Sequence, residues 1–264
     1  MLTAFRTDIG KVRLINEDRA AVQLGLNGFT LAIVADGMGG HQAGEVASKM
    51  AVELVQSHLL AVHKTLTEEQ RPEAVRQAIV HANETVYEFA SNQKRYHGMG
   101  TTVVVTLASE KQLTIGHIGD SRAYLWQAPV KEKGKDAQFR QVTEDHSLVN
   151  ELIRSGQITQ AEANNHPRRN VLTRALGTER QADVDVTLLN WHNGDILLMC
   201  SDGLSGLVED DIMAHVLAAD KDLEWKADEL VRLALAEGGD DNITVVLLEN
   251  RNTRIIEKNG GDDE

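Results

Sequence analysis

The sequence predicts an α+β protein that folds as a single domain, and two observations support this prediction. Residues 101–142 contain successive short apolar runs joined by polar loops that are too short for helical crossovers, which favours antiparallel strands. Helical periodicity occurs in separate stretches, at residues 43–62 and 72–89 and again between 209 and 237. The length of 264 residues leaves room for one large domain with a full core.

The elements can be followed along the chain. The branched apolar run at residues 29–35 is typical of a buried strand, and the helix over 43–62 is amphipathic. Pro72 opens a second helix, because proline is tolerated in a first helical turn. We expect further strands at 7–12, 20–24, 101–107, 112–119, 123–126, 139–142, 183–189, 194–201 and 242–249, and further helices at 209–218 and 223–237.

Residues 143–177 differ from their surroundings because they are polar and lack a convincing strand. A short helix is expected at 147–155, and Thr159-Gln160-Ala161-Glu162 has the spacing of a capping box for another. We interpret this segment as an insertion over the functional site, with a simple surface excursion as the alternative. The domain then spans residues 1–250, and the acidic residues 251–264, which lack apolar anchors, are expected to be disordered.

The composition narrows the possible functions. Hydrophobic residues make up 42% and charged residues 25%, as in an ordinary globular protein, and the net charge of -13 argues against nucleic acid as the main partner. No apolar stretch has membrane-spanning length, and residues 1–6 lack the apolar core of a signal peptide, so we expect a cytoplasmic protein without membrane insertion. Cys200 is the single cysteine, which excludes an internal disulfide. We also expect a monomer.

Aspartates recur at the ends of the apolar strands. Asp36-Gly37 follows the run at 29–35, Asp202-Gly203 follows the run at 197–201, and Asp241 precedes the final strand. A single Asp-Gly after a strand is most often a hairpin turn. If the three strand ends lie side by side, however, the carboxylates repel one another unless cations neutralise them, and a bound divalent metal is the ordinary remedy.

Two other polar segments remain open to two interpretations. Arg13, Glu17 and Asp18 lie in a charged surface turn or, alternatively, supply a planar fork for a phosphate and carboxylates for metal-bound water. Asp120 lies at an acidic tip beside Gly119, which taken alone is a plain turn.

Taken together, these motifs resemble a known family. Arg13 with Asn16-Glu17-Asp18, residues 35–41, Gly100-Thr101-Thr102, Gly119-Asp120-Ser121-Arg122, Asp145-His146-Ser147, Ser201-Asp202-Gly203 and Asp241-Asn242 occur in this order. Over about residues 7–248, the chain resembles the bacterial type 2C metal-dependent protein serine/threonine phosphatases of the PPM family. The resemblance implies an α-β-β-α sandwich of two antiparallel sheets flanked by helices, with residues 143–177 as a flap.

The resemblance also implies a binuclear Mn²⁺ or Mg²⁺ centre. In that family's pattern, Asp36 bridges both metals, the Gly37 carbonyl binds one of them, and Asp202 and Asp241 bind the other. Glu17 and Asp18 act mainly through metal-bound water, and Asp120 with Asp202 matches a third, weaker site. Oxygen ligands of this kind suit Mn²⁺ or Mg²⁺ better than zinc.

The implied reaction is hydrolysis of phosphoserine and phosphothreonine on proteins by a metal-bridging hydroxide, with Arg13 clamping the phosphate. Met38 stands where eukaryotic relatives have a histidine that is proposed as general acid, and His41 is the nearest substitute. His41 either donates the proton to the leaving group or only orients substrate or water. The implied partners are phosphorylated proteins, including a serine/threonine kinase that the enzyme opposes and the targets of that kinase.

Rival functions fit the sequence less well. A dinucleotide-binding fingerprint would need glycine at position 42, which is Gln42, and the sequence has no Gly-Lys-Ser/Thr phosphate loop. A non-catalytic module that senses phosphorylated partners would usually have lost its metal carboxylates, and all the matching ones are present here. A stress-response regulator that dephosphorylates one anti-sigma antagonist remains open within the phosphatase class.

Overall fold

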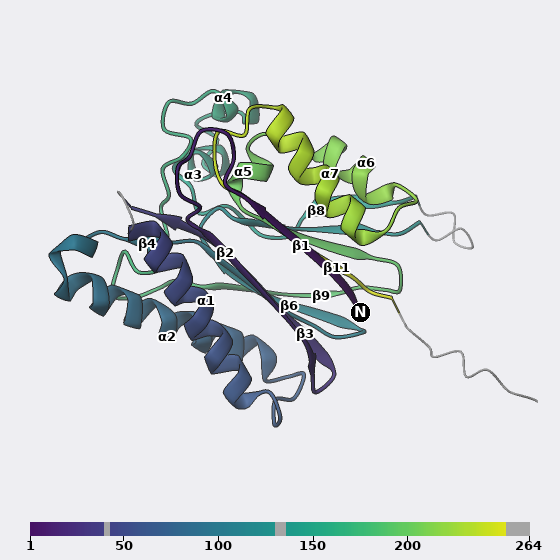
Figure 1. The fold of residues 1–264 in the computed structure, drawn as a ribbon, viewed down its shortest axis with the longest axis horizontal. Coiled ribbons are helices and arrows are strands. Elements are labelled where there is room, and N and C mark those ends of the chain that lie inside the picture. The colour runs from purple at the N-terminus through teal and green to yellow at the C-terminus, as the bar shows by residue number, and fades with distance from the viewer. Residues whose placement is uncertain (40–42, 130–135, 252–264) are drawn as a thin grey trace, which may run out of the picture.

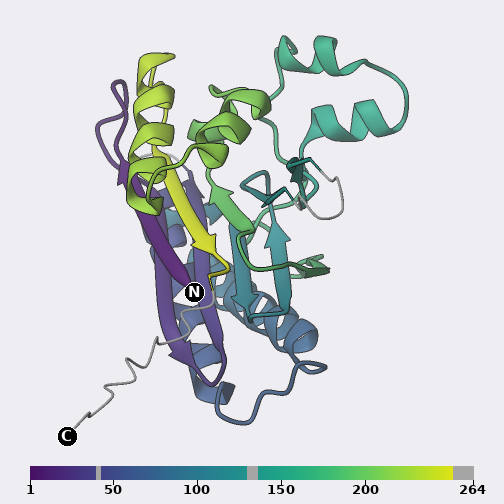
Figure 2. The same ribbon diagram turned by 90° about the vertical axis from the view of Figure 1, so that its right-hand side faces the viewer.

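The computed structural model describes residues 1–39, 43–129 and 136–251, and these residues form a four-layer α-β-β-α sandwich (Figures 1 and 2). Two antiparallel sheets lie face to face in the middle, and helices cover the outer face of each. The predicted α+β class and sandwich architecture are therefore confirmed. Among the described residues, no helix is long and apolar enough to cross a membrane.

The first sheet has the strand order β1-β11-β10-β7-β8, and each neighbouring pair is antiparallel. The second has the order β2-β3-β5-β6-β9, and the short β4 pairs with the end of β3. The bounds are β1 Leu2–Asp8, β2 Asp18–Leu26, β3 Phe29–Met38, β4 Gly100–Thr101, β5 Val103–Ala108, β6 Gln112–Ile118, β7 Arg122–Gln127, β8 Gln138–Gln141, β9 Asp185–Asn190, β10 Ile196–Cys200 and β11 Ile243–Glu249.

The long helices fall into two pairs. Helices α1 (Ala43–Val62) and α2 (Arg71–Asn92) cover the second sheet, while α6 (Asp210–Ala218) and α7 (Leu223–Ala236) cover the first (Figure 1). The shorter helices are the 3-10 helix η1 (Lys94–Tyr96), α3 (Leu148–Arg154), α4 (Gln160–Asn164) and α5 (Asp202–Ser205). The helix predicted over 43–62 is confirmed at both ends.

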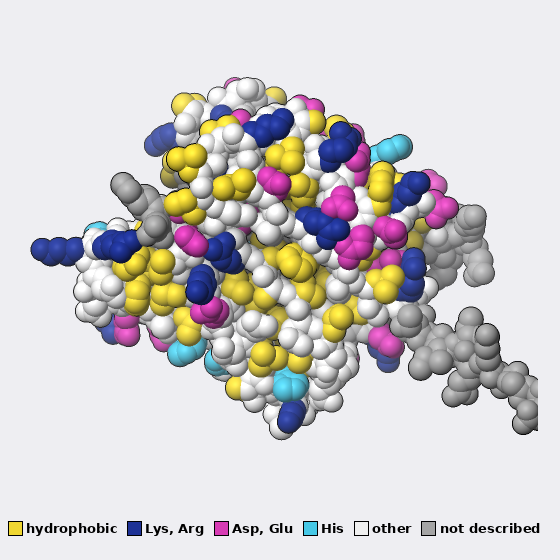
Figure 3. All heavy atoms as spheres, viewed as in Figure 1, with side chains coloured by type: hydrophobic (Ala, Val, Ile, Leu, Met, Phe, Trp, Pro, Cys, Tyr) yellow, Lys and Arg dark blue, Asp and Glu magenta, His cyan; other side chains and the backbone are white. Residues whose placement is uncertain are grey.

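Alternation along the central strands explains the layers. In β3, Leu31 and Ile33 belong to the cluster under α1 and α2, whereas Ala32 and Val34 pack between the two sheets. Both sets are fully buried, as expected for a strand whose two faces are both covered. The outer strands β1 and β2 are less protected, and Phe5 and Leu24 on them are exposed. Figure 3 shows hydrophobic side chains at the surface of this face of the molecule.

Two predicted strands differ from the structure by more than their end residues. The first strand ends at Asp8 rather than running from 7 to 12, because Gly10 turns the chain with a φ of +79° against the backbone of Asp241. The expected strand at 101–107 is divided at Thr102, which separates β4 from β5. Asp202, just after the next-to-last strand, begins the short helix α5.

The flap segment, residues 143–177, carries α3 and α4 away from the sandwich (Figure 2). Ser147 caps α3, and Thr159 and Glu162 form the predicted capping box of α4. The two ends of the segment run beside each other: the amide of Leu148 donates to the Val171 carbonyl at 2.8 Å. His41 and the tail beyond residue 251, both named in the sequence-based predictions, lie outside the described residues.

Candidate metal centre

One end of the sandwich gathers acidic side chains from both sheets. Asp36 on β3 lies directly opposite Asp18 on β2 in the strand register. Asp202 follows β10, and Asp120 occupies the tip between β6 and β7. Asp241 precedes β11. With Glu17, these residues are called the carboxylate cluster below.

The electrostatics of the cluster show that its members lie close enough to repel one another. Burial, followed by the charges of Asp18 and Asp202, raises the pKa of Asp36 well above its usual range. Burial raises the pKa of Asp18 to about 7, and burial with the charge of Asp202 does the same for the pKa of Asp120. The pKa of Asp202 is also raised, first by burial and then by Asp241. Nearby positive charge would relieve this repulsion.

Several oxygens of the cluster have no hydrogen-bond partner. Glu17 Oε1, Asp18 Oδ1 and Asp202 Oδ1 are all buried without one. A buried carboxylate oxygen that accepts nothing is costly, so such atoms call for an explanation. A hard divalent cation takes oxygen ligands of this type, and the residues present therefore fit Mn²⁺ or Mg²⁺.

Arg13 contributes positive charge at the border of the cluster. Its Nη2 lies 2.5 Å from Asp241 Oδ2, and its side chain remains 49% exposed. The guanidinium thus adjoins the cluster while keeping one side toward solvent. This position suits a group that meets an incoming phosphate.

Three polar residues that had no individual role in the sequence-based predictions support the cluster. Ser201 Oγ donates to Asp18 Oδ2 at 2.7 Å, and the side-chain nitrogen Nδ2 of Asn242 donates to the carbonyls of Ile9 and Ile15 at 2.9 and 3.0 Å. Thr102 Oγ1 accepts from the Asp36 amide at 3.0 Å. Their only signal in the sequence was that each belongs to one of the motifs that carry the resemblance.

Gly37 has a structural reason to be glycine. A Cβ at this position would collide with the carbonyl of Gly44, and it would lie 2.7 Å from that of Glu17. The amide of Gly37 also donates to the Glu17 carbonyl at 3.2 Å. The close approach of α1 to the end of β3 therefore requires this residue, whether or not its carbonyl binds an ion.

A cleft of about 790 Å³ adjoins the cluster. Its walls come from the flap segment and from the turn after α5, and they include Asp120, Asp202 and Arg122. Arg122 forms an ion pair with Asp145 at 2.7 Å, which fixes the beginning of the flap segment to β7. A substrate that enters here meets Asp120 and Asp202 in the lining of the cleft.

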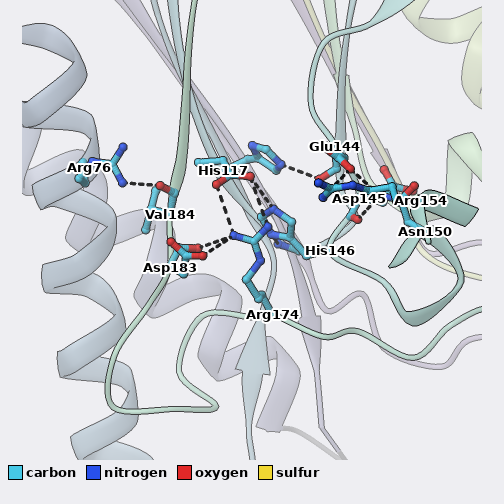
Figure 4. A network of polar contacts seen from close by, with 12 residues as sticks. Arg76, His117, Glu144, Asp145, His146, Asn150, Arg154, Arg174, Asp183 and Val184 are labelled. Carbon is cyan, nitrogen blue, oxygen red and sulfur yellow. Dashed lines mark hydrogen bonds and ion pairs between the residues drawn. The ribbon is translucent and has the colours of Figure 1, made fainter. Parts of the chain in front are cut away.

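A second group of titratable side chains lies nearby, at His117, His146 and Asp185 (Figure 4). One ligand atom from each lies within 4.8 Å of the other two, and among the described residues this is the grouping of histidine, cysteine and acidic side chains that meets that distance. It is called the histidine cluster below. The sequence did not single it out, because its members stand far apart along the chain.

Comparison with known proteins now defines the class. Residues 11–240 match the family described as protein phosphatase 2C. The chain belongs to this family, and it is a metal-dependent protein phosphatase that acts on phosphorylated proteins.

Individual relatives are similar over nearly the whole length. The chain is 42% identical to the serine/threonine phosphatase stp of Listeria monocytogenes, covering 94% of this chain and 96% of that protein. It is 36% identical to protein phosphatase PhpP of Streptococcus pneumoniae, covering 92% and 94%. Among solved structures, a bacterial serine phosphatase gives a TM-score of 0.86 at 35% identity and full coverage of both chains. The catalytic domain of PstP, solved with two manganese ions, gives 0.78 at 33% identity, covering 94% and 97%.

Proposed function

We propose that this protein phosphatase removes phosphate from phosphoserine and phosphothreonine in proteins, using two Mn²⁺ or Mg²⁺ ions held by the carboxylate cluster. The observation that carries the proposal is the set of buried oxygens without partners on Glu17, Asp18 and Asp202. The names of the relatives support the amino acids proposed as substrate.

The ligands can be assigned by their place in the cluster. Asp36 would hold both ions, the Gly37 carbonyl one of them, and Asp202 with Asp241 the other. Glu17 and Asp18 would act mainly through water. Asp120 with Asp202 would hold a weaker third ion, which agrees with the raised pKa values of these two carboxyls.

The chain's own side chains then orient the substrate. When bound, the ions supply positive charge that lowers the pKa of a water and offsets the charge of the phosphoryl oxygens. Arg13 would turn from Asp241 to the phosphate, since its planar fork matches two phosphate oxygens. A water or His41 would supply the proton for the departing serine or threonine oxygen.

The biological setting follows from the substrate. Phosphoserine and phosphothreonine are made by protein kinases, so the enzyme would oppose a serine/threonine kinase and act on that kinase and its targets. We further propose a cytoplasmic monomer with one catalytic domain over residues 1–250. The single cysteine agrees with a reducing compartment.

Phosphate release from a phosphothreonine peptide, with Mn²⁺ or with a chelator, tests the proposal. We expect turnover only with the metal, and we expect Asp36→Asn to lower kcat by about 10³-fold or more, because asparagine keeps the volume but removes the charge. Asp228→Asn, at a side chain 60% exposed on α7, serves as the matched control. Circular dichroism checks that both variants fold. Near-normal turnover of Asp36→Asn would overturn the metal assignment.

A further inference from the structure

We propose that His146 is a positioning residue that fixes the Gly119–Asp120 tip. The proposal rests on the proposed function in one respect, namely that Asp120 takes part in ion binding. Its basis is the set of contacts in the histidine cluster (Figure 4).

His146 holds the tip by two hydrogen bonds. Its backbone amide donates to the Gly119 carbonyl at 3.0 Å, and its ring Nδ1 accepts from the Gly119 amide at 3.1 Å. The side chain is only 1% exposed, so water does not compete for these bonds. The residue that follows Gly119 is Asp120, which lines the cleft together with Asp202.

The other ring nitrogen reaches toward the flap segment. Because Nδ1 accepts a hydrogen bond, the proton of the neutral ring is on Nε2, which donates to Asp185 Oδ2 at 3.0 Å. Arg174, near the end of the flap segment, holds both oxygens of Asp185 at 3.3 Å. The amide of Thr173 donates to the His146 carbonyl at 2.9 Å. One continuous network thus runs from the flap segment to the tip.

Metal binding is the alternative interpretation of the histidine cluster, and the hydrogen bonds exclude it. A metal-bound histidine normally donates its second ring N–H to an acceptor. Here the second nitrogen, Nδ1, faces the N–H donor of Gly119, so a metal at Nε2 would require a ring without any proton. The guanidinium of Arg174 on Asp185 opposes a second cation as well.

His117 completes the scaffold. Its Nε2 lies 2.8 Å from the Glu144 carbonyl, to which it donates, and its ring stacks on that of His146 with centroids 4.6 Å apart and planes inclined by 20°. Stacking restrains the plane of the His146 ring, and the hydrogen bond attaches the beginning of the flap segment to β6. The ring nitrogens of His146 therefore point in defined directions.

The tip is held from another side by Thr102. Gly119 adopts a φ of +108°, and a Cβ there would lie 2.6 Å from the side chain of Thr102. Thr102 Oγ1 in turn lies 2.7 Å from Ser121 Oγ. The tip packs against Thr102, which also accepts a hydrogen bond from the Asp36 amide on β3. The remaining freedom of the tip is then controlled by His146. A metal ligand must be placed to within about 0.5 Å, so this control decides whether Asp120 is effective.

Two substitutions of His146 separate the two arms of its ring. His146→Asn places a side-chain oxygen near the position of Nδ1, where it can accept from Gly119, but it loses the bond to Asp185. His146→Gln can reach Asp185 but leaves the Gly119 amide without its acceptor. His192→Asn is the control, because His192 is 77% exposed at its side chain.

The readouts are the Gly119 amide resonance in metal-free protein and Mn²⁺ affinity by calorimetry. We expect His146→Gln to move the resonance and to weaken the Asp120-dependent binding step by about 10-fold, the effect typical of a residue that orients a ligand. We expect His146→Asn to keep the Mn²⁺ affinity close to the wild-type value, although loss of the aromatic ring moves the Gly119 resonance in both variants, and even if both melt at a lower temperature.

Asp120→Asn, measured in parallel, distinguishes the possible failures. If it binds Mn²⁺ as the wild type does, Asp120 is no ligand, and both its assigned role and the positioning role fail. If Asp120→Asn weakens binding but His146→Gln leaves binding unchanged, only the positioning role is overturned. Equal losses of affinity in His146→Asn and His146→Gln would likewise overturn it, because a purely structural effect does not distinguish the two nitrogens.

Discussion

The carboxylate cluster and the histidine cluster meet at the Gly119–Asp120 tip, yet they differ in how far their polar atoms are paired. In the carboxylate cluster, like charges are crowded together and buried oxygens on Glu17, Asp18 and Asp202 accept nothing. In the histidine cluster, both ring nitrogens of His146 have partners and the charge of Asp185 is met by Arg174. Compactness alone would have selected the histidine cluster as the metal site.

Buried oxygens that have no hydrogen-bond partner are therefore a better sign of cation binding than the close spacing of potential ligands. A network whose donors and acceptors are all matched is already at a favourable arrangement, and a cation would have to break it. A set of repelling carboxylates with free lone pairs gains from the same cation. The comparison favours ion binding in the carboxylate cluster and a positioning role for the histidine cluster.

The release of protons on Mn²⁺ binding tests the contrast between the two clusters, and it is the test for which we expect the strongest response. The pKa values of Asp18 and Asp120 are raised to about 7, so in metal-free protein their stabilising contribution is complete below the unfolded pKa of about 4 and is lost as the pH rises through about 7. We expect the free energy of unfolding to fall by about 3 kcal/mol between about pH 6 and pH 8, and Mn²⁺ to restore it. Burial lowers the pKa values of His117 and His146, which favours their neutral rings.

Calorimetry in buffers of different ionisation enthalpy counts the protons. We expect more protons to be released at about pH 6 than at about pH 8, and His117→Gln to leave the count unchanged. If the number of protons released does not vary with pH, or if it falls in His117→Gln, the ions bind at the histidines and not at the carboxylates.

The two arginines of these regions provide a second test. Arg13→Ala should raise the KM for p-nitrophenyl phosphate by about 10-fold, because a two-pronged phosphate contact is lost. Arg13→Lys should recover little of this loss, since an ammonium keeps the charge but not the fork. Arg174→Ala should lower the melting temperature without changing this KM. Full recovery with lysine would mean that Arg13 serves only to neutralise Asp241.

The sequence predicted the parts of the molecule that have a local pattern. Helix α1 was placed correctly because its apolar stripe repeats with helical period, and the convergence of Asp36, Asp202 and Asp241 was predicted because each adjoins an apolar strand. The first strand was misplaced because apolar residues continue past its end, although those at 9, 12, 14 and 15 are all exposed in the loop after β1.

The supports of the site could not be predicted, because they join distant segments. Ser201 and Asp18 are 183 residues apart, and Gly119 and His146 are 27 apart. No periodicity links such pairs, and each residue taken alone is an ordinary polar residue. The roles of Thr102, Ser201 and His146 therefore depend on the assembled sheets.

Ser201 offers the finest test of how the carboxylate cluster is maintained. Its hydroxyl donates to Asp18 at 2.7 Å and accepts from the Thr244 amide at 2.9 Å, and the residue is fully buried. Ser201→Ala should destabilise metal-free protein by about 1–3 kcal/mol, because both partners lose a bond in the interior. The loss should be greater at about pH 8 than at about pH 5, since the bond to an ionised Asp18 is the stronger one.

Denaturant unfolding at the two pH values measures this, with Ser155→Ala on the exposed end of α3 as the control. An equal loss at both would mean that Asp18 does not change its charge in this range, and the contrast between the two clusters would then rest on the partnerless oxygens alone.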